Sequence, residues 1–491
     1  MIRLKDNSAY VFITSLVAYL FVYGFEISHF TLSVDEEYMN NSLHTLSLGR
    51  WGHTLLHMYV LPEPWLPFFS ITTGIIFLAL SNIFICKYLK LDLVHSVIFS
   101  ILLVGMPQAA FQLEFGNQAD TYGISVFLTT VSILFFAEKS LKNSIIFVLA
   151  NAFAISIYQS SIVTPITIFL LKEMFDYFRN EPEYKTSLGN SIKSLIRLLA
   201  LLIASYIVYK IILILVMKAF GVSQSPYLAD FIGWNLGVAH GIKFGFGSVI
   251  KYTSFIFAPY GMKHFSFVLP ALLAILIIAF KRKRLEIFLC GFLALISVFA
   301  INIGIGSNLP PRTLIEAPMV FAGLITFVIF ATQKRDVGII FSVVILFFAC
   351  LFSSKLFYSD YAAREADSYV AQEIVSRIHE KVDGFDETKT PVFFTGTFTP
   401  QNVWKIENSD AFGFSFFEGK RYRILNYLKV INLANFTQPP DDKVSELVAY
   451  SKSMSTWPSS GSVALTDGIV IVKLGSDNTE NEDFKIDLRN R

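Results

Sequence analysis

Long apolar stretches, separated by short polar connections, dominate the first 354 residues of the chain. A helix needs about 20 apolar residues to cross a bilayer core of about 30 Å, and shorter stretches are tolerated where flanking residues reach the interface. The pattern therefore predicts an α-helical polytopic membrane protein with about eleven transmembrane helices. These helices are predicted at residues 10–30, 65–86, 93–110, 121–137, 145–157, 160–171, 195–217, 265–280, 285–303, 314–332 and 337–354.

The apolar stretch at residues 145–171 allows two interpretations, one long helix or two short helices that meet at residues 158–161. Short connections rich in Lys and Arg stay in the cytoplasm. With a cytoplasmic N-terminus, the basic clusters at residues 281–284 and 334–335 continue the alternation only if this stretch crosses twice. We therefore predict two short helices, which places Tyr158 and Gln159 on the outer side.

The character of the chain changes after residue 354, where the long apolar stretches end. Residues 390–398 and 462–475 alternate between apolar and polar positions as strands do, and residues 361–382 favour a helix. We predict two domains, a transmembrane domain at 1–354 and a small outer α/β domain at 355–491 with a polar end from residue 476. The outer loops of the first domain would be residues 31–64, 111–120, 218–264 and 304–313.

Composition agrees with a membrane protein, since 54% of the residues are hydrophobic, 16% are charged and the mean hydropathy is +0.55. The net charge of +2 gives no indication of a nucleic acid partner. The three cysteines imply no disulfide framework and do not have the spacing of a metal site. The chain also has no Gly-rich phosphate loop of the Walker or Rossmann type, so it shows no nucleotide site.

Three consecutive acidic residues, Asp35, Glu36 and Glu37, follow the first apolar stretch directly. Ionisable groups at membrane depth are costly and usually functional. The apolar spacing of residues 43–60 predicts an amphipathic helix along the interface, which would bring Arg50 near these acids. The alternative is that the acids only cap that helix, which is more plausible for Glu37 than for the other two.

A second outer loop carries Glu114 and Asp120, with no Lys or Arg next to them. If the first four helices pack together, this loop faces the first acidic loop. Two such loops suggest a general base, a divalent cation such as Mg²⁺ or Mn²⁺, or both. The alternative is that Asp120 caps a helix and Glu114 is solvated.

Basic and imidazole side chains on the outer side are few. Arg312 lies in SNLPPRTLIEAP, where its planar fork suits two phosphate oxygens, although it and Lys251 have the alternative of reaching lipid headgroups. His53 and His57 have the i, i+4 spacing of zinc ligands, but Thr54 stands where zinc peptidases carry Glu, and we assign no metal ligand.

The acidic triplet after the first helix, the LGRWG segment, the many helices and the small outer domain together resemble the phage-borne serotype-converting O-antigen glucosyltransferases. The similarity extends through PPRTLIEAPMVFAGLI to the tail. That family belongs to the polytopic glycosyltransferases of the GT-C class. The resemblance implies inverting transfer of glucose from undecaprenyl-phosphate-glucose to a lipopolysaccharide O-antigen sugar, on the periplasmic side of a bacterial inner membrane. It also implies a separate donor-making enzyme and a flippase as functional partners.

By this resemblance Asp35 or Glu36 would be the catalytic base, with Asp35 favoured by the acidic start of the family motif. No covalent intermediate is needed, and no cofactor is implied beyond the divalent cation considered above. The expected substrate-binding residues are Glu37, Arg50, Trp51, Glu114, Asp120, Tyr158, Gln159, Lys251 and Arg312. Two other functions remain open, an O-antigen polymerase and a non-enzymatic transporter or flippase of lipid-linked sugars. A polymerase is not expected to carry the acidic triplet or the long tail, and a flippase should show inverted halves with matching broken helices.

Overall fold

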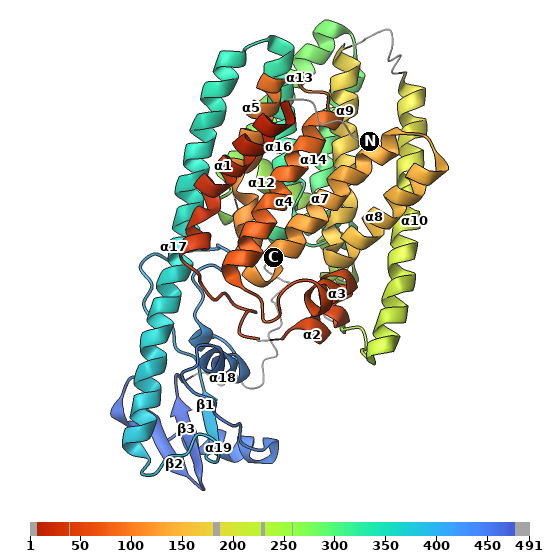
Figure 1. Ribbon diagram of the computed structural model, residues 1–491. Helices are drawn as coiled ribbons and strands as arrows, with labels where there is room; N and C mark the ends of the chain where they lie inside the picture. Colours follow the sequence, from red (N-terminus) through yellow and green to blue (C-terminus); the bar gives the residue numbers. More distant parts are fainter. Residues whose placement is uncertain (1–6, 39, 180–186, 227–230, 258, 477–491) are drawn as a thin grey trace. The chain divides into compact units, whose positions relative to one another are not determined.

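The computed structural model describes residues 7–38, 40–179, 187–226, 231–257 and 259–476 (Figure 1). The predicted polar end of the chain therefore lies outside the described residues, apart from Ser476. Clustering by proximity separates the described chain into two compact units. Unit 1 contains residues 7–28 and 41–354, and unit 2 contains residues 29–40 and 355–476. The predicted outer loop at 31–64 is thus shared between the two units.

Each predicted apolar stretch corresponds to a helix. The main helices are α1 (Asn7–Ser28), α4 (Pro67–Tyr88), α5 (Leu93–Val104), α7 (Gly116–Ala137), α8 (Leu141–Ile157), α9 (Thr164–Arg179), α10 (Leu188–Phe220), α13 (Val268–Arg282), α14 (Leu285–Val298), α16 (Ala317–Thr332) and α17 (Arg335–Lys381). In the described chain, seven helical segments are long and apolar enough to cross a membrane, and α8, α14 and α16 are shorter apolar helices. The fold is that of a helical membrane protein, and the number of crossings stays a prediction.

Short elements connect these helices. They are α2 (Ser42–Ser47), α3 (Trp51–Tyr59), η1 (Pro107–Ala109), α6 (Ala110–Leu113), η2 (Gln159–Val163), η4 (Gly233–Leu236), α11 (Val238–Gly241), η5 (Ile242–Phe246), α12 (Gly247–Thr253), η6 (Pro259–Gly261), η7 (Lys263–Phe267), α15 (Ala300–Ile305) and η8 (Pro311–Thr313). The predicted interruption near residue 158 is confirmed, because α8 ends at Ile157, Tyr158 has an extended backbone and α9 begins at Thr164 after η2.

The predicted single helix at residues 43–60 is wrong, because the structure has two short helices, α2 and α3, at this position. Gly49 separates them with φ of 85°, a backbone conformation that glycine adopts without strain. A Cβ atom at Gly49 would also lie 2.8 Å from the hydroxyl oxygen of Tyr209 on α10. The glycine thus breaks the helix and lets α10 approach the backbone.

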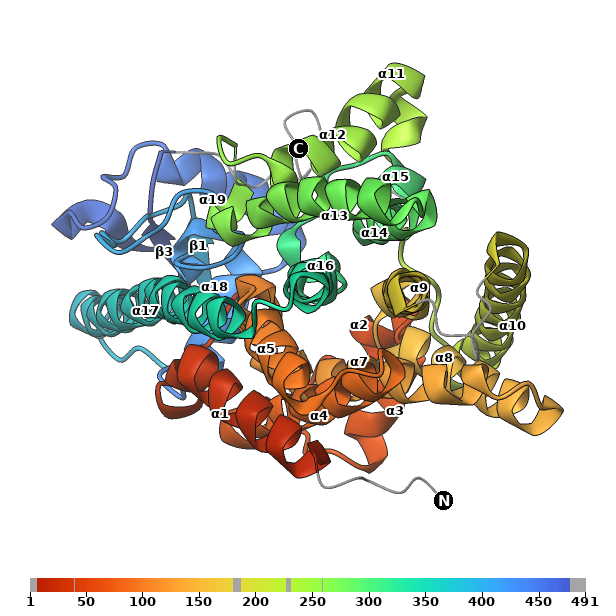
Figure 2. The same cartoon turned by 90° about the horizontal axis from the view of Figure 1, so that it is seen from above.

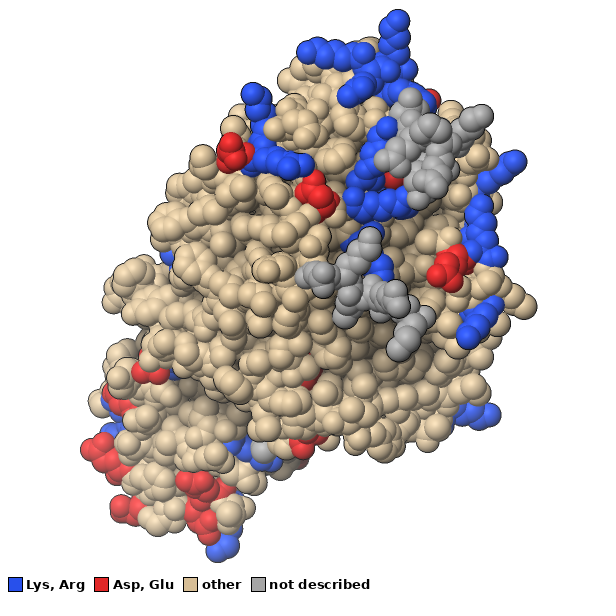
Figure 3. All heavy atoms as spheres, turned by 45° about the horizontal axis from the view of Figure 1, so that its top comes forward, with Lys and Arg blue, Asp and Glu red and all other residues tan. Residues whose placement is uncertain are grey.

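Lys and Arg gather at one end of unit 1, which comes forward in Figure 3 as blue side chains on the helix connections. Contacts within this end join separate connections: Arg179 donates to the Leu89 carbonyl at 2.8 Å, and Arg335 pairs with Asp92 at 3.1 Å. The basic residues at this end include Lys87, Lys90, Lys139, Lys142, Lys172, Arg179, Lys193, Arg197, Lys281, Arg282, Lys283, Arg284, Lys334 and Arg335. Basic residues are thus concentrated on the connections at this end of the unit.

Unit 2 contains a three-stranded sheet in the order β1–β3–β2 (Figure 1). Strand β1 (Val392–Thr395) pairs in parallel with β3 (Ile469–Lys473), and β2 (Val463–Thr466) pairs antiparallel with β3. The strand predicted at 462–475 is therefore a hairpin, which turns at Asp467 and Gly468, both with positive φ. The other elements are η9 (Phe416–Glu418), α18 (Arg421–Val430), η10 (Asp441–Lys443), α19 (Val444–Ser451) and η11 (Ser460–Ser462).

The helix predicted at 361–382 is not a separate element, because α17 continues without interruption from Arg335 to Lys381. No glycine or proline occurs between Gly338 and Gly384, so nothing in the local sequence ends the helix where the apolar stretch ends. One helix thus contributes to both units.

Two glycines bring α4 and α7 into backbone contact, and Figure 2 shows these helices side by side. A Cβ atom at Gly74 would lie 2.3 Å from the carbonyl oxygen of Ala119, and one at Gly123 would lie 2.5 Å from the carbonyl oxygen of Gly74. Small residues allow this approach between membrane helices. The contact also holds the start of α7 against α4.

We expect Gly74→Val to lower the stability of the protein by about 1–3 kcal/mol, because the added side chain forces the two backbones apart. The measurement is the midpoint of thermal unfolding of purified protein in detergent. Gly24→Val on α1 is the control, since a Cβ atom at Gly24 meets nothing within 4 Å. Equal midpoints for the two variants would contradict this interpretation.

Candidate functional site

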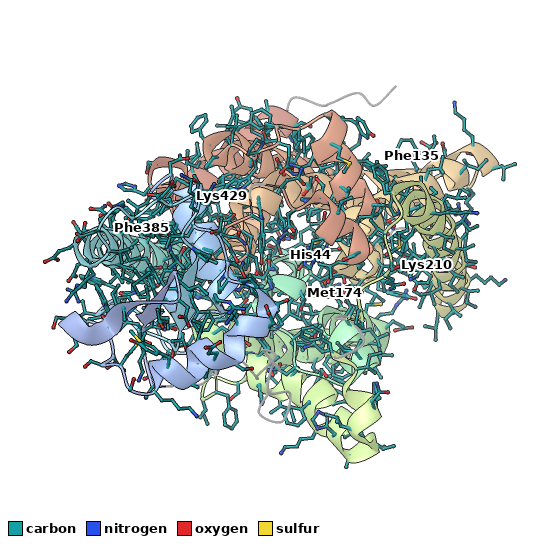
Figure 4. The ribbon with its side chains drawn as sticks, turned by 90° about the horizontal axis from the view of Figure 1, so that it is seen from below. His44, Phe135, Met174, Lys210, Phe385 and Lys429 are labelled. Atoms are coloured by element: carbon teal, nitrogen blue, oxygen red, sulfur yellow. The ribbon has the colours of Figure 1, made fainter. Side chains whose placement is uncertain are left out.

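At the end of unit 1 opposite the basic connections, three polar side chains from distant segments come together. Nη1 of Arg50, which precedes α3, donates to Oε1 of Gln118 at 2.6 Å, and its guanidinium lies 5.3 Å from the ring centroid of Tyr158. The Tyr158 hydroxyl donates to the carbonyl of Arg312 at 3.0 Å. Tyr158, at the break between α8 and α9, thus links the two predicted phosphate-binding arginines. Figure 4 labels His44 on α2, the short helix that precedes Arg50 in the chain.

Both guanidinium groups lie against aromatic rings and are partly exposed. The Arg312 guanidinium lies 4.9 Å from the ring centroid of Phe115. Next to Tyr158, Nε2 of Gln159 donates to the Leu48 carbonyl at 2.9 Å and so fixes the turn before Arg50. Planar guanidinium groups held in this way can present several N–H donors to an oxyanion.

A second cluster surrounds His57 on α3. Its Nε2 lies 3.4 Å from Oδ1 of Asp120, and its Nδ1 lies 3.5 Å from Oε2 of Glu63. The other oxygen of Asp120 accepts a hydrogen bond of 3.0 Å from Ser70 on α4. Asp120 is fully buried and lies beyond Phe115, the N-cap residue of α7, so the interpretation of Asp120 as a helix cap is wrong.

The two neighbouring histidines have opposite pKa shifts. Burial lowers the pKa of His57, but the hydrogen bond and charge of Asp120 and the charge of Glu63 outweigh burial, so the pKa is raised above 6.5. The pKa of His53 is lowered well below 6.5 by burial and by the charges of His57 and Arg50. His53 Nδ1 shares a hydrogen bond of 2.8 Å with the Thr121 hydroxyl, and the two imidazole centroids are 4.6 Å apart.

The remaining predicted residues of unit 1 occupy different environments. Glu114 is only 1% exposed, so the interpretation of Glu114 as a solvated residue is wrong. Trp51 is buried, packs against Phe153 and donates to the Tyr209 carbonyl at 3.3 Å, which favours a packing role. Lys251 belongs to α12, where its ammonium lies 5.6 Å from the ring centroid of Phe244.

The acidic triplet belongs to unit 2 and forms a compact loop. Arg423, on α18, binds two of its members: Nη2 lies 2.7 Å from Oδ1 of Asp35, and Nη1 lies 2.9 Å from Oε1 of Glu37. The second oxygen of Glu37 accepts the Asp35 N–H at 2.8 Å, and Oε2 of Glu36 accepts the Ser33 N–H at 2.8 Å. The acids thus bind their own loop and an arginine from the tail.

Capping of the following helix by Glu37 is wrong, because the N-cap residue of α2 is Asn41. The triplet is also unequal in exposure: the side chain of Asp35 is 52% exposed and that of Glu37 is 0% exposed. Glu36 is 1% exposed. Burial raises the pKa of Glu37 above 4.5, against the opposing effect of Arg423. Since the triplet and the acids Glu114 and Asp120 belong to different units, their predicted meeting stays a prediction.

A divalent cation does not fit the triplet as the structure arranges it. Oδ1 of Asp35 and Oε1 of Glu37, the oxygens that would bind a cation, both accept hydrogen bonds from the Arg423 guanidinium. The described part of the chain contains no group of three or more His, Cys, Asp or Glu residues arranged to hold a metal ion. We therefore derive no chemical step through a cation.

Three polar residues that the structure pairs, Glu63, Glu316 and Arg423, were missed from sequence. Glu316 is 1% exposed and accepts a hydrogen bond of 2.9 Å from Thr164 at the start of α9. The sequence could have identified Glu316, because a carboxyl group inside an apolar stretch is a functional candidate by itself. Glu63 and Arg423 carried no comparable signal, since each lies in a polar segment and acquires its partner only through the fold.

These features define a mostly helical protein with several apolar helices and with carboxylates and guanidinium groups in its polar connections. Residues 24–332 match the family described as Glucosyl transferase GtrII. This match covers more than half of the chain, so the chain belongs to that family, which confirms the resemblance to the serotype-converting glucosyltransferases. The matched region includes the acidic triplet and Arg312 but not Arg423. No curated protein and no solved structure matched the chain.

The two histidines lead to a prediction of opposite pH trends between pH 6 and 9. Since the folded pKa of His57 is raised, its stabilising pairing is complete at low pH and is lost as the pH rises through that pKa. The destabilisation caused by His57→Gln should therefore shrink as the pH rises. For His53, whose folded pKa is lowered, the unfolded state takes up a proton as the pH falls toward 6, so the destabilisation by His53→Gln should shrink in that direction.

Thermal unfolding of both variants and the wild-type protein at several pH values measures these trends. The two histidines are matched controls for each other, because they lie on the same helix and their rings are in contact. Parallel pH trends for the two variants would show that the charge of His57 does not depend on Asp120 and Glu63.

Proposed function

We propose that the protein is an inverting glycosyltransferase of the GT-C class that moves glucose from undecaprenyl-phosphate-glucose to a sugar of the lipopolysaccharide O-antigen. The observation that carries this proposal is the match of residues 24–332 to the Glucosyl transferase GtrII family. The apolar helices support a substrate carried in a membrane, because a polyprenyl chain is insoluble in water. The family match also favours sugar transfer over polymerisation and over transport.

In the proposed reaction a carboxylate removes the proton from an acceptor hydroxyl. The acceptor oxygen bonds to C1 of glucose as the bond between C1 and the phosphate oxygen breaks, and that electron pair leaves with the phosphate. A general base of this kind contributes about 10²–10⁴ in rate, and the transition state has the oxocarbenium character known from glycoside hydrolysis. A single displacement inverts the configuration at C1.

The exposures of the acids support Asp35 as the base. Its side chain is 52% exposed, whereas Glu36 is 1% exposed and accepts the backbone N–H of Ser33. A base must reach the acceptor hydroxyl, and a carboxylate at the surface of its unit can do so. Glu36 and Glu37 would then shape the loop that presents Asp35.

The arginines at Tyr158 support a role in binding the donor phosphate. Negative charge develops on the phosphate oxygen as the bond to C1 breaks, and fixed guanidinium groups stabilise such charge without reorganisation. The guanidinium of Arg50 and the main-chain carbonyl of Arg312 contact the same tyrosine, and the Arg312 guanidinium lies against Phe115. The proposed donor site would also include Gln159, which fixes the turn before Arg50, and Asp120 on α7. It would further include Lys251 on α12.

The charge distribution supports a location in the bacterial inner membrane with the basic end of unit 1 in the cytoplasm. The polar connections that carry Arg50, Tyr158 and Arg312 would then lie on the periplasmic side, together with the N-terminal and C-terminal parts of unit 2. A donor used on that side must be made by a cytoplasmic enzyme and moved across the membrane by a flippase. These two proteins are the proposed functional partners.

The direct test is the pair Asp35→Asn and Glu36→Gln in cells that make the O-antigen. We expect Asp35→Asn to lower glucosylation by about 10²–10⁴ because it removes the base, and Glu36→Gln to lower it less. Antibody recognition of the modified O-antigen measures glucosylation, and the ladder of O-antigen lengths on a gel should stay unchanged. Asp383→Asn, at an exposed position of unit 2, is the control. Normal modification in both variants would disprove the assignment, and loss of the ladder would indicate a polymerase.

Donor binding gives an independent prediction. Arg312→Lys keeps the charge but loses the planar fork, so we expect kcat/KM for the polyprenyl-phosphate donor to fall by about tenfold, mainly through KM. Arg282→Lys, at the basic end of unit 1, is the matched control. An unchanged KM in Arg312→Lys would show that Arg312 does not bind the donor.

A further inference from the structure

We propose that Arg423 is a positioning residue that holds the Asp35 carboxylate in its working geometry, so that the tail of the chain completes the active site. This inference rests on the proposed function, because it takes Asp35 as the base. Arg423 is separated from Glu37 by 386 residues and from Asp35 by 388 residues, and it lies beyond residue 332, where the family match ends. The matched region by itself therefore has the acids without this partner.

The guanidinium of Arg423 binds two carboxylates with separate nitrogens. Nη2 reaches Oδ1 of Asp35 at 2.7 Å, and Nη1 reaches Oε1 of Glu37 at 2.9 Å. Charge-assisted hydrogen bonds of this length are about twice as strong as neutral ones. The planar fork of arginine suits the arrangement, whereas the single ammonium of lysine does not.

Glu37 connects Arg423 to the backbone of Asp35, in addition to the direct bond between Arg423 and the Asp35 side chain. While one oxygen of Glu37 accepts a hydrogen bond from Arg423, the other accepts the N–H of Asp35 at 2.8 Å. Asp35 has a φ of 81°, in the left-handed region that a non-glycine residue occupies only when its surroundings impose it. Arg423 thus acts on both the carboxylate and the main chain of Asp35.

Arg423 comes from a packed element, which makes it suitable for positioning. It lies in the first turn of α18, whose residues Ile424, Leu425 and Leu428 are buried. A Cβ atom at Gly419 would lie 3.0 Å from Cδ of Arg423, so the glycine leaves room for the arginine stem. The side chain of Arg423 is 21% exposed, and its position is therefore set by the core of unit 2.

The second oxygen of Asp35 is suited to accept a proton. Among the described residues, the hydrogen bond from Arg423 uses Oδ1, and the Asp35 side chain is half exposed. Arg423 therefore orients the carboxylate through one oxygen while the other can face an acceptor hydroxyl. A structural ion pair that buried both oxygens would not allow this.

The pairing predicts which kinetic constant depends on Arg423. A base contributes to the rate only when its oxygen lies within hydrogen-bond reach of the acceptor hydroxyl, whereas donor binding is proposed to depend on Arg50 and Arg312. Loss of Arg423 should therefore lower kcat and leave KM for the donor nearly unchanged. Asp360 on α17 is joined to the same loop through Ser33, so the fold of the loop does not depend on Arg423 alone.

The experiment compares full-length Arg423→Gln, Arg423→Lys and wild-type protein in nanodiscs, with a synthetic polyprenyl-phosphate-glucose donor and purified O-antigen acceptor. We expect Arg423→Gln to lower kcat by about tenfold or more and to leave KM for the donor nearly unchanged, because the base is displaced while the proposed phosphate contacts remain. Arg423→Lys should recover part of kcat, because it keeps the charge and loses the fork.

Arg377→Gln is the matched control, because Arg377 is also a partly buried arginine of unit 2, 19% exposed, and pairs with Glu373 at 2.7 Å. Its kcat should stay at the wild-type value. Glu37→Gln is a second test that does not remove the arginine. Since a neutral amide weakens the hydrogen bonds of Glu37 with Arg423 and with the Asp35 backbone, kcat should fall while KM for the donor stays nearly unchanged.

Wild-type kinetics in Arg423→Gln would overturn the proposal, as would a rise in KM for the donor with an unchanged kcat. If Arg423→Gln does not fold, as judged by its unfolding midpoint, Glu37→Gln decides, and an unchanged kcat in that variant rejects the inference. Asp35→Asn separates this inference from the proposed function. Full activity in Asp35→Asn and Glu36→Gln rejects the base itself, whereas an inactive Asp35→Asn with a wild-type kcat in Arg423→Gln rejects only the role of Arg423.

Discussion

A charged or polar group in an apolar environment has to be compensated, and the placement of the functional side chains follows from this requirement. Asp120 is fully buried and has Ser70, Thr121 and His57 as partners. The buried carboxylate of Glu37 is held by an arginine and a backbone N–H. Ser70, His57 and Arg423 come from other segments than the carboxylates they contact, so these polar groups also connect elements. The same requirement forces the backbone of the apolar stretches into helices, because the bilayer core holds no water to hydrogen-bond the backbone N–H and C=O groups.

Close helix packing positions one of these groups directly. Gly74 allows the backbone of α4 to touch that of α7 at Ala119, the residue before Asp120. Ser70 lies one turn before Gly74 on α4 and donates to the Asp120 carboxylate. The small residue and the hydroxyl therefore act together, because the first brings the helices close and the second satisfies the charge that this approach buries.

The interruption between α8 and α9 has a similar role in the arginine cluster. Tyr158 has an extended backbone and stands between two helices, so its ring and hydroxyl can contact Arg50 and Arg312 in different directions. A continuous helix would have placed residue 158 on one helical face. Broken helices in membranes occur where the free backbone groups are buried in protein, and here Tyr158, Gln159 and Ser161 supply polar contacts at the break.

The eleven helical stretches, the break near residue 158 and a small α/β tail followed from sequence, because apolar length and the alternation of apolar and polar residues depend on local composition alone. Arg50, Tyr158 and Arg312 were also selected from their rarity and position. The break at Gly49 and the continuity of α17 were not predicted, since the first depends on contact with α10 and the second on the absence of a stop signal.

By itself, the sequence determined which segments leave water and which residue types are costly at their edges, since both depend on the transfer energy of individual side chains. Only the tertiary structure decided the partners. It paired His57 with Asp120, and it assigned Asp35 and Glu37 to Arg423, more than 380 residues away. A hydrogen bond is defined by distance and direction between atoms, and no local pattern along the chain contains that information.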